Sequence, residues 1–326
     1  MVTVKTLIGF FQIVTEVEEV FIMELPVKAV RFIKSFSWLD LSVSDLIQLE
    51  CVGLGGYLNE LKLTAAVPPL ILFFLAAYAL INEAVAEKKR GWKLAQGTSL
   101  RFLPSALFVT FLVVPDVSSL AFRSFRCECF GDESWLRADY SLQCSTGGCA
   151  TEHFTDEYIR TRRTAWAVLW VYALGVPCGY ALLLFYKRRA IMEQVCTPLA
   201  DALAFLHSDF KPSCYWWELI NLAQKLFVVG FATLIMPGNM MQLVIVKLVM
   251  VVFLLLLVVV KPYKVRAVGI LALVEQIALL YFFAVCFIVK AEQLAMQVSA
   301  QFMTKEVHTA FFYNTEAISM TMLTTL

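Results

Sequence analysis

The sequence predicts an all-α fold, a polytopic integral membrane helical bundle, from its composition, its long apolar stretches and the placement of its basic residues. Hydrophobic residues make up 60% of the 326 residues and charged residues only 16%, and the mean hydropathy is +0.73. A soluble domain usually carries about a quarter charged residues. We therefore expect most of this chain to lie in a lipid bilayer.

The transmembrane helices are predicted from stretches of about 20 mostly apolar residues, the length needed to cross a bilayer. Six stretches meet this condition: residues 63–82, 102–122, 164–186, 219–236, 241–260 and 267–289. A weaker stretch, residues 3–23, carries Glu16, Glu18 and Glu19, so it is either a weak span or an interfacial helix. The prediction is six transmembrane helices plus a seventh at the N-terminus.

These stretches divide the chain into three expected parts. Residues 1–62 hold the N-terminal weak span or interfacial helix and a connecting segment. Residues 63–290 form the transmembrane bundle, with a cysteine-containing loop at 123–163. Residues 291–326 form an amphipathic tail, because their apolar residues recur at helical spacing and few of them are charged.

The orientation of the bundle follows from Lys and Arg, which concentrate in cytosolic loops of membrane proteins. Basic residues gather in the loops at 86–101, 187–217 and 261–266, which all fall on one side of the predicted bundle. We assign this side to the cytosol of a protein in the plasma membrane or an endomembrane. The loop at 123–163 then lies on the extracytosolic side.

Four cysteines of this loop, Cys127, Cys129, Cys144 and Cys149, are disulfide candidates. An oxidising compartment favours structural disulfides, and the loop lies opposite the basic loops. The rival interpretation is a zinc site that combines these thiols with His153. We favour disulfides, with a connectivity that the spacing does not fix.

Polar residues inside the predicted spans are the candidate functional residues. Glu218, Asn221 and Lys225 follow an aromatic cluster and share one helix face. The candidates for an intramembrane polar pathway or for ion pairs are Glu218, Asn221, Gln224, Lys225, Lys247, Glu275 and Gln276. Ionisable residues within a bilayer favour a functional role, whereas buried charges need partners wherever they lie. A cation pathway and structural ion pairs both remain open.

Several function classes are excluded by what the sequence lacks. The formal net charge of +1 gives no reason to expect nucleic-acid binding. No glycine-rich phosphate loop, metalloprotease motif or nucleophile elbow occurs in the sequence. We therefore expect no enzyme, no cofactor and no metal site. The expected partners are the lipid bilayer, cations and further copies of this chain.

An ordered set of short motifs resembles a known family. The motifs are KTLIGFFQIV at 5–14, VPDVS at 114–118, FRC at 125–127, WLRADYSLQC at 135–144, GVP at 175–177, FKP at 210–212, YWWE at 215–218, PG at 237–238 and KPY at 261–263. In order and spacing they are similar to the C-terminal membrane region of large TRP-like proteins of algae and other protists. Those proteins often carry ephrin-receptor-like repeats and are distantly similar to polycystin-like channels.

This resemblance implies a TRP-like multi-pass membrane protein that acts as a cation channel or transport module. The alternative is a non-conducting, receptor-like or scaffolding membrane module. A tetrameric channel of the TRP type needs a pore helix and filter between its last two helices. The loops at 237–240 and 261–266 are too short for one and carry no acidic ring, so the resemblance does not supply a pore mechanism directly.

The depth of Lys225 and Glu275, each about two turns inside its predicted span, makes them the leading ion-pair candidates. An unpaired charge at this depth costs on the order of 2.5–3.5 kcal/mol. If the pair is structural, Lys225→Met combined with Glu275→Gln recovers the folded yield that either single variant loses. If the pair lines a pathway, the double variant folds and loses transport. Normal folding and transport in both single variants would contradict both interpretations.

Overall fold

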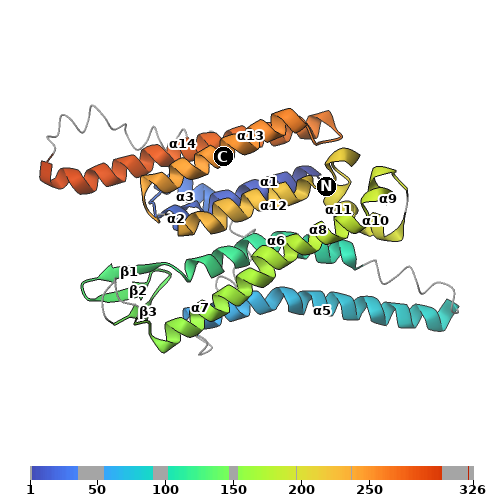
Figure 1. Ribbon diagram of the computed structural model, residues 1–326, viewed down its shortest axis with the longest axis horizontal. Coiled ribbons are helices and arrows are strands. Elements are labelled where there is room, and N and C mark those ends of the chain that lie inside the picture. The colour runs from blue at the N-terminus through green and yellow to red at the C-terminus, as the bar shows by residue number, and fades with distance from the viewer. Residues whose placement is uncertain are drawn as a thin grey trace. The chain divides into compact units, whose positions relative to one another are not determined.

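The computed structural model describes residues 2–35, 55–90, 102–146, 153–195, 197–235, 237–302 and 322. These residues are mostly helical (Figure 1). The chain divides into two compact units. The terminal unit combines Met1–Asp40 with Phe227–Leu326, and the central unit is Leu41–Leu226.

Five helices among the described residues are long and apolar enough to cross a membrane. They are Tyr57–Asn82, Leu103–Arg123, Asp156–Tyr186, Met240–Val260 and Arg266–Ala295. Each contains or nearly matches one of the apolar stretches predicted from sequence, at 63–82, 102–122, 164–186, 241–260 and 267–289. The prediction of a helical membrane protein is thus confirmed at the level of five candidate spans.

The sixth predicted span, residues 219–236, is not confirmed as one long helix. Its chain forms three short pieces: α12 (Trp217–Lys225), a π-helix (Leu226–Gly230) and a 3-10 helix (Phe231–Leu234). Thr233 Oγ1 donates to the carbonyl of Gly230 at 2.6 Å, and Ile235 is extended. Apolar composition over 18 residues therefore predicted a continuous helix where the backbone changes conformation repeatedly.

The predicted N-terminal seventh span is not confirmed either. Residues 3–23 form α1 (Val2–Thr15) and α2 (Val17–Phe21), both too short to cross a bilayer. The second helix ends at Ile22, whose backbone is left-handed with φ 52°. After Pro26 the chain forms α3 (Val27–Lys34).

Two long helices, α13 (Met240–Val260) and α14 (Arg266–Phe302), pack side by side in the terminal unit (Figure 1). Lys261, with φ 47°, ends α13 and starts the tight connection. The helix α14 does not stop at residue 290, after which we expected the amphipathic tail to begin, but continues to Phe302. The rest of that tail, apart from Met322, lies outside the described residues.

The central unit contains α5 (Tyr57–Arg90), α6 (Leu103–Arg123) and a third span made of α7 (Asp156–Leu169), a π-helix (Trp170–Gly175) and α8 (Val176–Tyr186). The π-helix lies just before Pro177, which has no N–H to donate. The N–H of Val176 bonds to Val171 O, five residues back. Gly175 and Pro177 therefore produce a local widening of the helix within one candidate span rather than a break in it.

Short helices connect this span to α12. They are α9 (Arg188–Met192), α10 (Pro198–Ala202), α11 (Ala204–His207) and a 3-10 turn (Pro212–Cys214). The hydroxyl of Thr197 caps α10 by accepting from the N–H of Ala200 at 3.3 Å. The predicted loop at 187–217 is therefore largely helical within the described residues.

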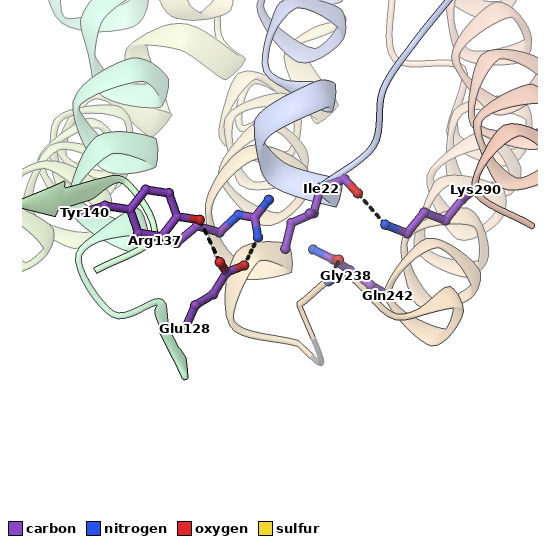
Figure 2. A network of polar contacts seen from close by, with 7 residues as sticks. All are labelled: Ile22, Glu128, Arg137, Tyr140, Gly238, Gln242 and Lys290. Atoms are coloured by element: carbon purple, nitrogen blue, oxygen red, sulfur yellow. Dashed lines mark hydrogen bonds and ion pairs between the residues drawn. The ribbon is translucent and has the colours of Figure 1, made fainter. Parts of the chain in front are cut away.

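A three-stranded antiparallel sheet connects α6 to α7, so the prediction of an all-α fold is wrong for this loop. Its strands are β1 (Cys127–Phe130), β2 (Glu133–Leu136) and β3 (Asp139–Ser145), in the order β1-β2-β3 (Figure 1). Arg137 forms an ion pair with Glu128, which also accepts from the Tyr140 hydroxyl at 2.6 Å (Figure 2).

A disulfide between Cys127 and Cys144 joins β1 to β3, and Cys129 is disulfide-bonded as well. Disulfide sulfurs have no thiolate to offer a metal. The structure therefore favours disulfides over the zinc site for these candidates. Cys149, the fourth candidate, lies outside the described residues.

Tyr57, the first residue of α5, fixes this helix to the sheet. Its ring is buried with Leu136, Cys144 and Tyr158, and its hydroxyl donates to the carbonyl of Leu120 in α6. Its N–H donates to Asp139 Oδ2 at 3.0 Å. Burial raises the pKa of Asp139, but hydrogen bonds from Ser141 and from Tyr57 outweigh it and hold this pKa below its ordinary value.

The disulfide-bonded Cys127 and Cys129 of β1 should be accessible from outside the cell if the sheet is extracytosolic, because Cys127 is half-buried and Cys129 is exposed. After mild reduction of intact cells, we expect an impermeant maleimide to label the peptide that carries these two thiols, as measured by mass spectrometry. Buried Cys286 should stay unlabelled and serves as the control. Labelling only after permeabilisation, and without reductant, would contradict the assigned orientation.

Candidate functional site

The predicted pathway residues fall into two groups. Four of them, Glu218, Asn221, Gln224 and Lys225, lie on α12 in the central unit. The other three, Lys247, Glu275 and Gln276, lie on α13 and α14 in the terminal unit. The Lys225–Glu275 pair would join the two units, and it stays a prediction.

The group on α12 is withdrawn from solvent. Glu218, Gln224 and Lys225 are 5%, 8% and 7% exposed, and Asn221 is half-buried. Asn221 Nδ2 donates to Glu218 Oε2 at 3.3 Å, which fits the helical spacing that places them on one face. The backbone positions of Glu218 and Lys225 are separated by about 10.5 Å along the helix axis, at 1.5 Å per residue.

Lys225 lies over an aromatic ring of the neighbouring helix α6. Its Nζ is 4.1 Å from the centroid of the Phe111 ring. A ring face attracts a cation by roughly 0.5–2 kcal/mol, with the larger values at desolvated sites. Phe111 is itself packed edge-on against Phe205 of α11, with ring centroids 5.6 Å apart. The aromatic ring therefore provides part of the stabilisation that sequence reasoning sought from an acid alone.

Two hydroxyl groups, on α6 and α8, lie close to each other in the same unit as the α12 residues. The hydroxyls of Thr110 and Tyr180 are 2.5 Å apart, and the Tyr180 hydroxyl lies 3.2 Å from the carbonyl of Leu107, to which it donates. Glu218 lies on α12, which packs against the helix α8 that carries Tyr180. We call Thr110, Phe111, Tyr180, Glu218 and Lys225 the central polar cluster.

Sequence reasoning missed Thr110, Phe111 and Tyr180. A signal for Tyr180 was present, because a tyrosine hydroxyl inside an apolar helix needs a hydrogen-bond partner. Thr110 and Phe111 carried no such signal. A threonine in a helix can bond the carbonyl one turn back, as Thr110 does to Ala106 O at 2.8 Å, and a phenylalanine in a span is ordinary.

The terminal unit brings its predicted residues into different contacts. Gln276 is buried, and its Nε2 donates to the carbonyl of Met250 at 3.2 Å, which joins α14 to α13. Lys247 Nζ lies 4.7 Å from the centroid of the Phe287 ring. Glu275 is half-buried. The two lysines among the predicted pathway residues, Lys225 and Lys247, thus both lie over phenylalanine rings.

The chemistry that the central polar cluster can perform is charge stabilisation. Among the described residues, no group of three or more His, Cys, Asp or Glu side chains could hold a metal ion.

A separate open pocket of about 440 Å³ lies where α5 and α7 begin and includes Asn59, Asp156 and Arg160 in its lining. Its lining contains none of the central polar cluster.

Comparison with known proteins gives this chain no relative: no family model, curated protein or solved structure matches it. The resemblance to TRP-like proteins therefore stays a prediction.

The hydroxyl of Tyr180 should stabilise the central unit. Tyr180→Phe removes the hydrogen bond that the Tyr180 hydroxyl donates to Leu107 O, and we expect the free energy of unfolding to fall by about 1 kcal/mol, the usual net value of one hydrogen bond. Tyr186→Phe is the matched control, because Tyr186 lies on the same helix with 75% of its surface exposed. Equal melting temperatures for the two variants in detergent would show that the Tyr180 contacts do not contribute.

Proposed function

We propose that this chain is a TRP-like multi-pass membrane protein that conducts or transports cations, with the central polar cluster as part of the pathway. One observation carries the proposal: Glu218 is an acid buried on a helix of an apolar protein, where it accepts a hydrogen bond from the amide of Asn221. Ionisable groups are rare inside membranes because they are costly, and they commonly mark ion pathways. A carboxylate attracts cations, which sets the sign of the permeant ion.

The interrupted helix after α12 supports the same proposal. Backbone that leaves the α-helix at membrane depth is tolerated only where protein surrounds it or where it lines a cavity. Transporters use such discontinuous helices to build their ion sites. The π-helix at Leu226–Gly230 directly follows Lys225, so the change in backbone begins at the end of the polar group on α12.

The topology that accompanies this function has six or seven spans, with residues 219–236 and 3–23 crossing as interrupted helices. The loops at 86–101, 187–217 and 261–266 face the cytosol. The protein resides in the plasma membrane or an endomembrane and assembles with further copies of itself. The arrangement needs no cofactor, and its substrate is a cation rather than a molecule to be chemically changed.

Neutralising Glu218 should reduce cation flux. In proteoliposomes made from the purified full-length chain, we expect Glu218→Gln to lower the uptake of Na⁺, K⁺ or Ca²⁺ about tenfold or more. The reason is that one hydrogen bond or contact to a charged group contributes about 1.5–3 kcal/mol, and 1.4 kcal/mol corresponds to a factor of ten. Flux is measured with ion-sensitive dyes trapped inside the vesicles.

The matched control is Glu133→Gln, because Glu133 is an exposed acid on β2, outside the helices. It should transport like the unmodified chain. A folded unmodified chain that passes none of the three cations under any membrane potential would reject the conduction proposal. Equal flux in both variants would remove Glu218 from the pathway.

The alternative is a non-conducting receptor-like or scaffolding module, and the disulfide-bonded sheet favours it. Phe130 and Tyr140 project from this sheet with 56% and 53% of their surface exposed, and their ring centroids are 5.9 Å apart. Exposed aromatic residues are common at sites of protein recognition. Absence of flux together with retained folding would favour this second function.

A further inference from the structure

The short helix α3 has two chemically different faces. Ala29 and Ile33 are buried at 0% and 6% exposure, on the side that packs against α1. On the other side, Lys28, Arg31 and Lys34 are exposed. At 100° of rotation per residue, these three cations fall within an arc of about 120°. An apolar side packed on protein and a cationic side open to the surroundings are typical of a helix at a membrane surface.

Hydrogen bonds from α14 fix where this helix lies along the candidate spans. Lys290 Nζ donates to the carbonyl of Ile22, and Gln293 Nε2 donates to the carbonyl of Glu24 at 2.6 Å. Figure 2 shows the Lys290 contact beside Gly238 and Gln242. The segment that precedes α3 is thus held beside residues 290–293, near the C-terminal end of α14.

This position along α14 corresponds to the membrane surface. The candidate span in α14 is Arg266–Ala295, which is longer than the roughly 20 helical residues that cross the hydrocarbon core. With Arg266 at one surface, the last turns of this helix, including Lys290 and Gln293, extend to headgroup level at the other. The same end of the terminal unit includes the start of α13, where Gln242 Nε2 donates to the carbonyl of Val20 at 2.9 Å. Since α3 begins three residues after Glu24, it lies at this level as well.

From these placements we infer that α3 is a lipid-binding helix, on which Lys28, Arg31 and Lys34 bind the phosphate groups of anionic phospholipid headgroups. The charge is complementary, because Glu24 is the one acid between residues 22 and 35 of the sequence. Val27, 73% exposed, lies among the cations and adds the apolar contact that interfacial helices use. This binding site lies at the end of the terminal unit opposite the connection between α13 and α14, so its lipid belongs to the leaflet opposite that connection. The inference does not depend on cation transport.

The test is a titration of the purified full-length protein in neutral detergent micelles with phosphatidylglycerol, with phosphatidylcholine as the uncharged comparison. Lipid that binds the folded state raises its melting temperature, so the midpoint of the rise gives an apparent affinity. Phosphatidylglycerol should stabilise the protein at lower concentration than phosphatidylcholine. For Lys28→Gln, Arg31→Gln and Lys34→Gln together, we expect the affinity for phosphatidylglycerol to fall about fivefold per charge, on the order of a hundredfold in total.

Two control variants make the test specific. Lys28→Arg, Arg31→Lys and Lys34→Arg keep the charge and should keep the affinity. Lys261→Gln, Lys264→Gln and Arg266→Gln remove three exposed cations from the connection between α13 and α14, and should retain the α3-dependent affinity. The inference is overturned if the α3 triple Gln variant binds phosphatidylglycerol like the unmodified chain, if the control triple loses as much, or if inorganic phosphate stabilises the protein as well as the lipid does.

Discussion

Gln242 forms hydrogen bonds to backbone N–H and C=O groups where the chain of the terminal unit departs from regular helix. The arrangement of that unit depends on these bonds. Inside a membrane, a backbone polar group without a partner costs several kcal/mol, because no water is present to replace it. Gln242 is 1% exposed. Its Nε2 donates to Val20 O at 2.9 Å and to Ala232 O at 2.8 Å, and its Oε1 accepts from Gly238 N–H at 3.1 Å. One side chain therefore joins α2, the 3-10 helix and the turn before α13.

Gly238 shows why this junction tolerates few alternatives. Its φ is +80°, and a Cβ at this position would lie 3.3 Å from Ile22 Cδ1. A side chain here would be strained by the backbone and crowded by Ile22. The polar contacts of Gln242 and the close approach at Gly238 thus specify the same fit between the N-terminal segment and the start of α13.

Tyrosine hydroxyls perform a comparable role in the central unit. Tyr57 donates to Leu120 O, Tyr172 to Ala65 O at 2.5 Å, and Tyr180 to Leu107 O at 3.2 Å. Each bond joins two different helices through a carbonyl that is already part of a helix. Lipid removes most of the hydrophobic driving force between helices, so packing and interhelical hydrogen bonds hold them together. These three bonds connect α5, α6 and the span from α7 to α8.

The sequence predicted the five long helices because apolar length is the only property that a span strictly requires. It did not predict the interruption after α12, because the residues that follow Lys225 are as apolar as those of an unbroken span. The sheet was missed for a different reason. Its strands are only four to seven residues long, and their cysteines drew attention to disulfide chemistry rather than to strand pairing. Gly131, with φ +62° at the β1–β2 turn, was the available signal of a hairpin.

Sequence analysis named the charged residues of the candidate site but did not name the groups around them. A search for charged pairs assigns each lysine of a predicted span to an acid, yet Lys225 and Lys247 both lie over phenylalanine rings. A ring face stabilises a cation without adding a second charge that must itself be desolvated. Phenylalanine also counts as apolar in every hydropathy scale, so this contribution is invisible to a search for polar residues. The sequence of a membrane protein therefore shows where charge is buried more readily than it shows what stabilises that charge.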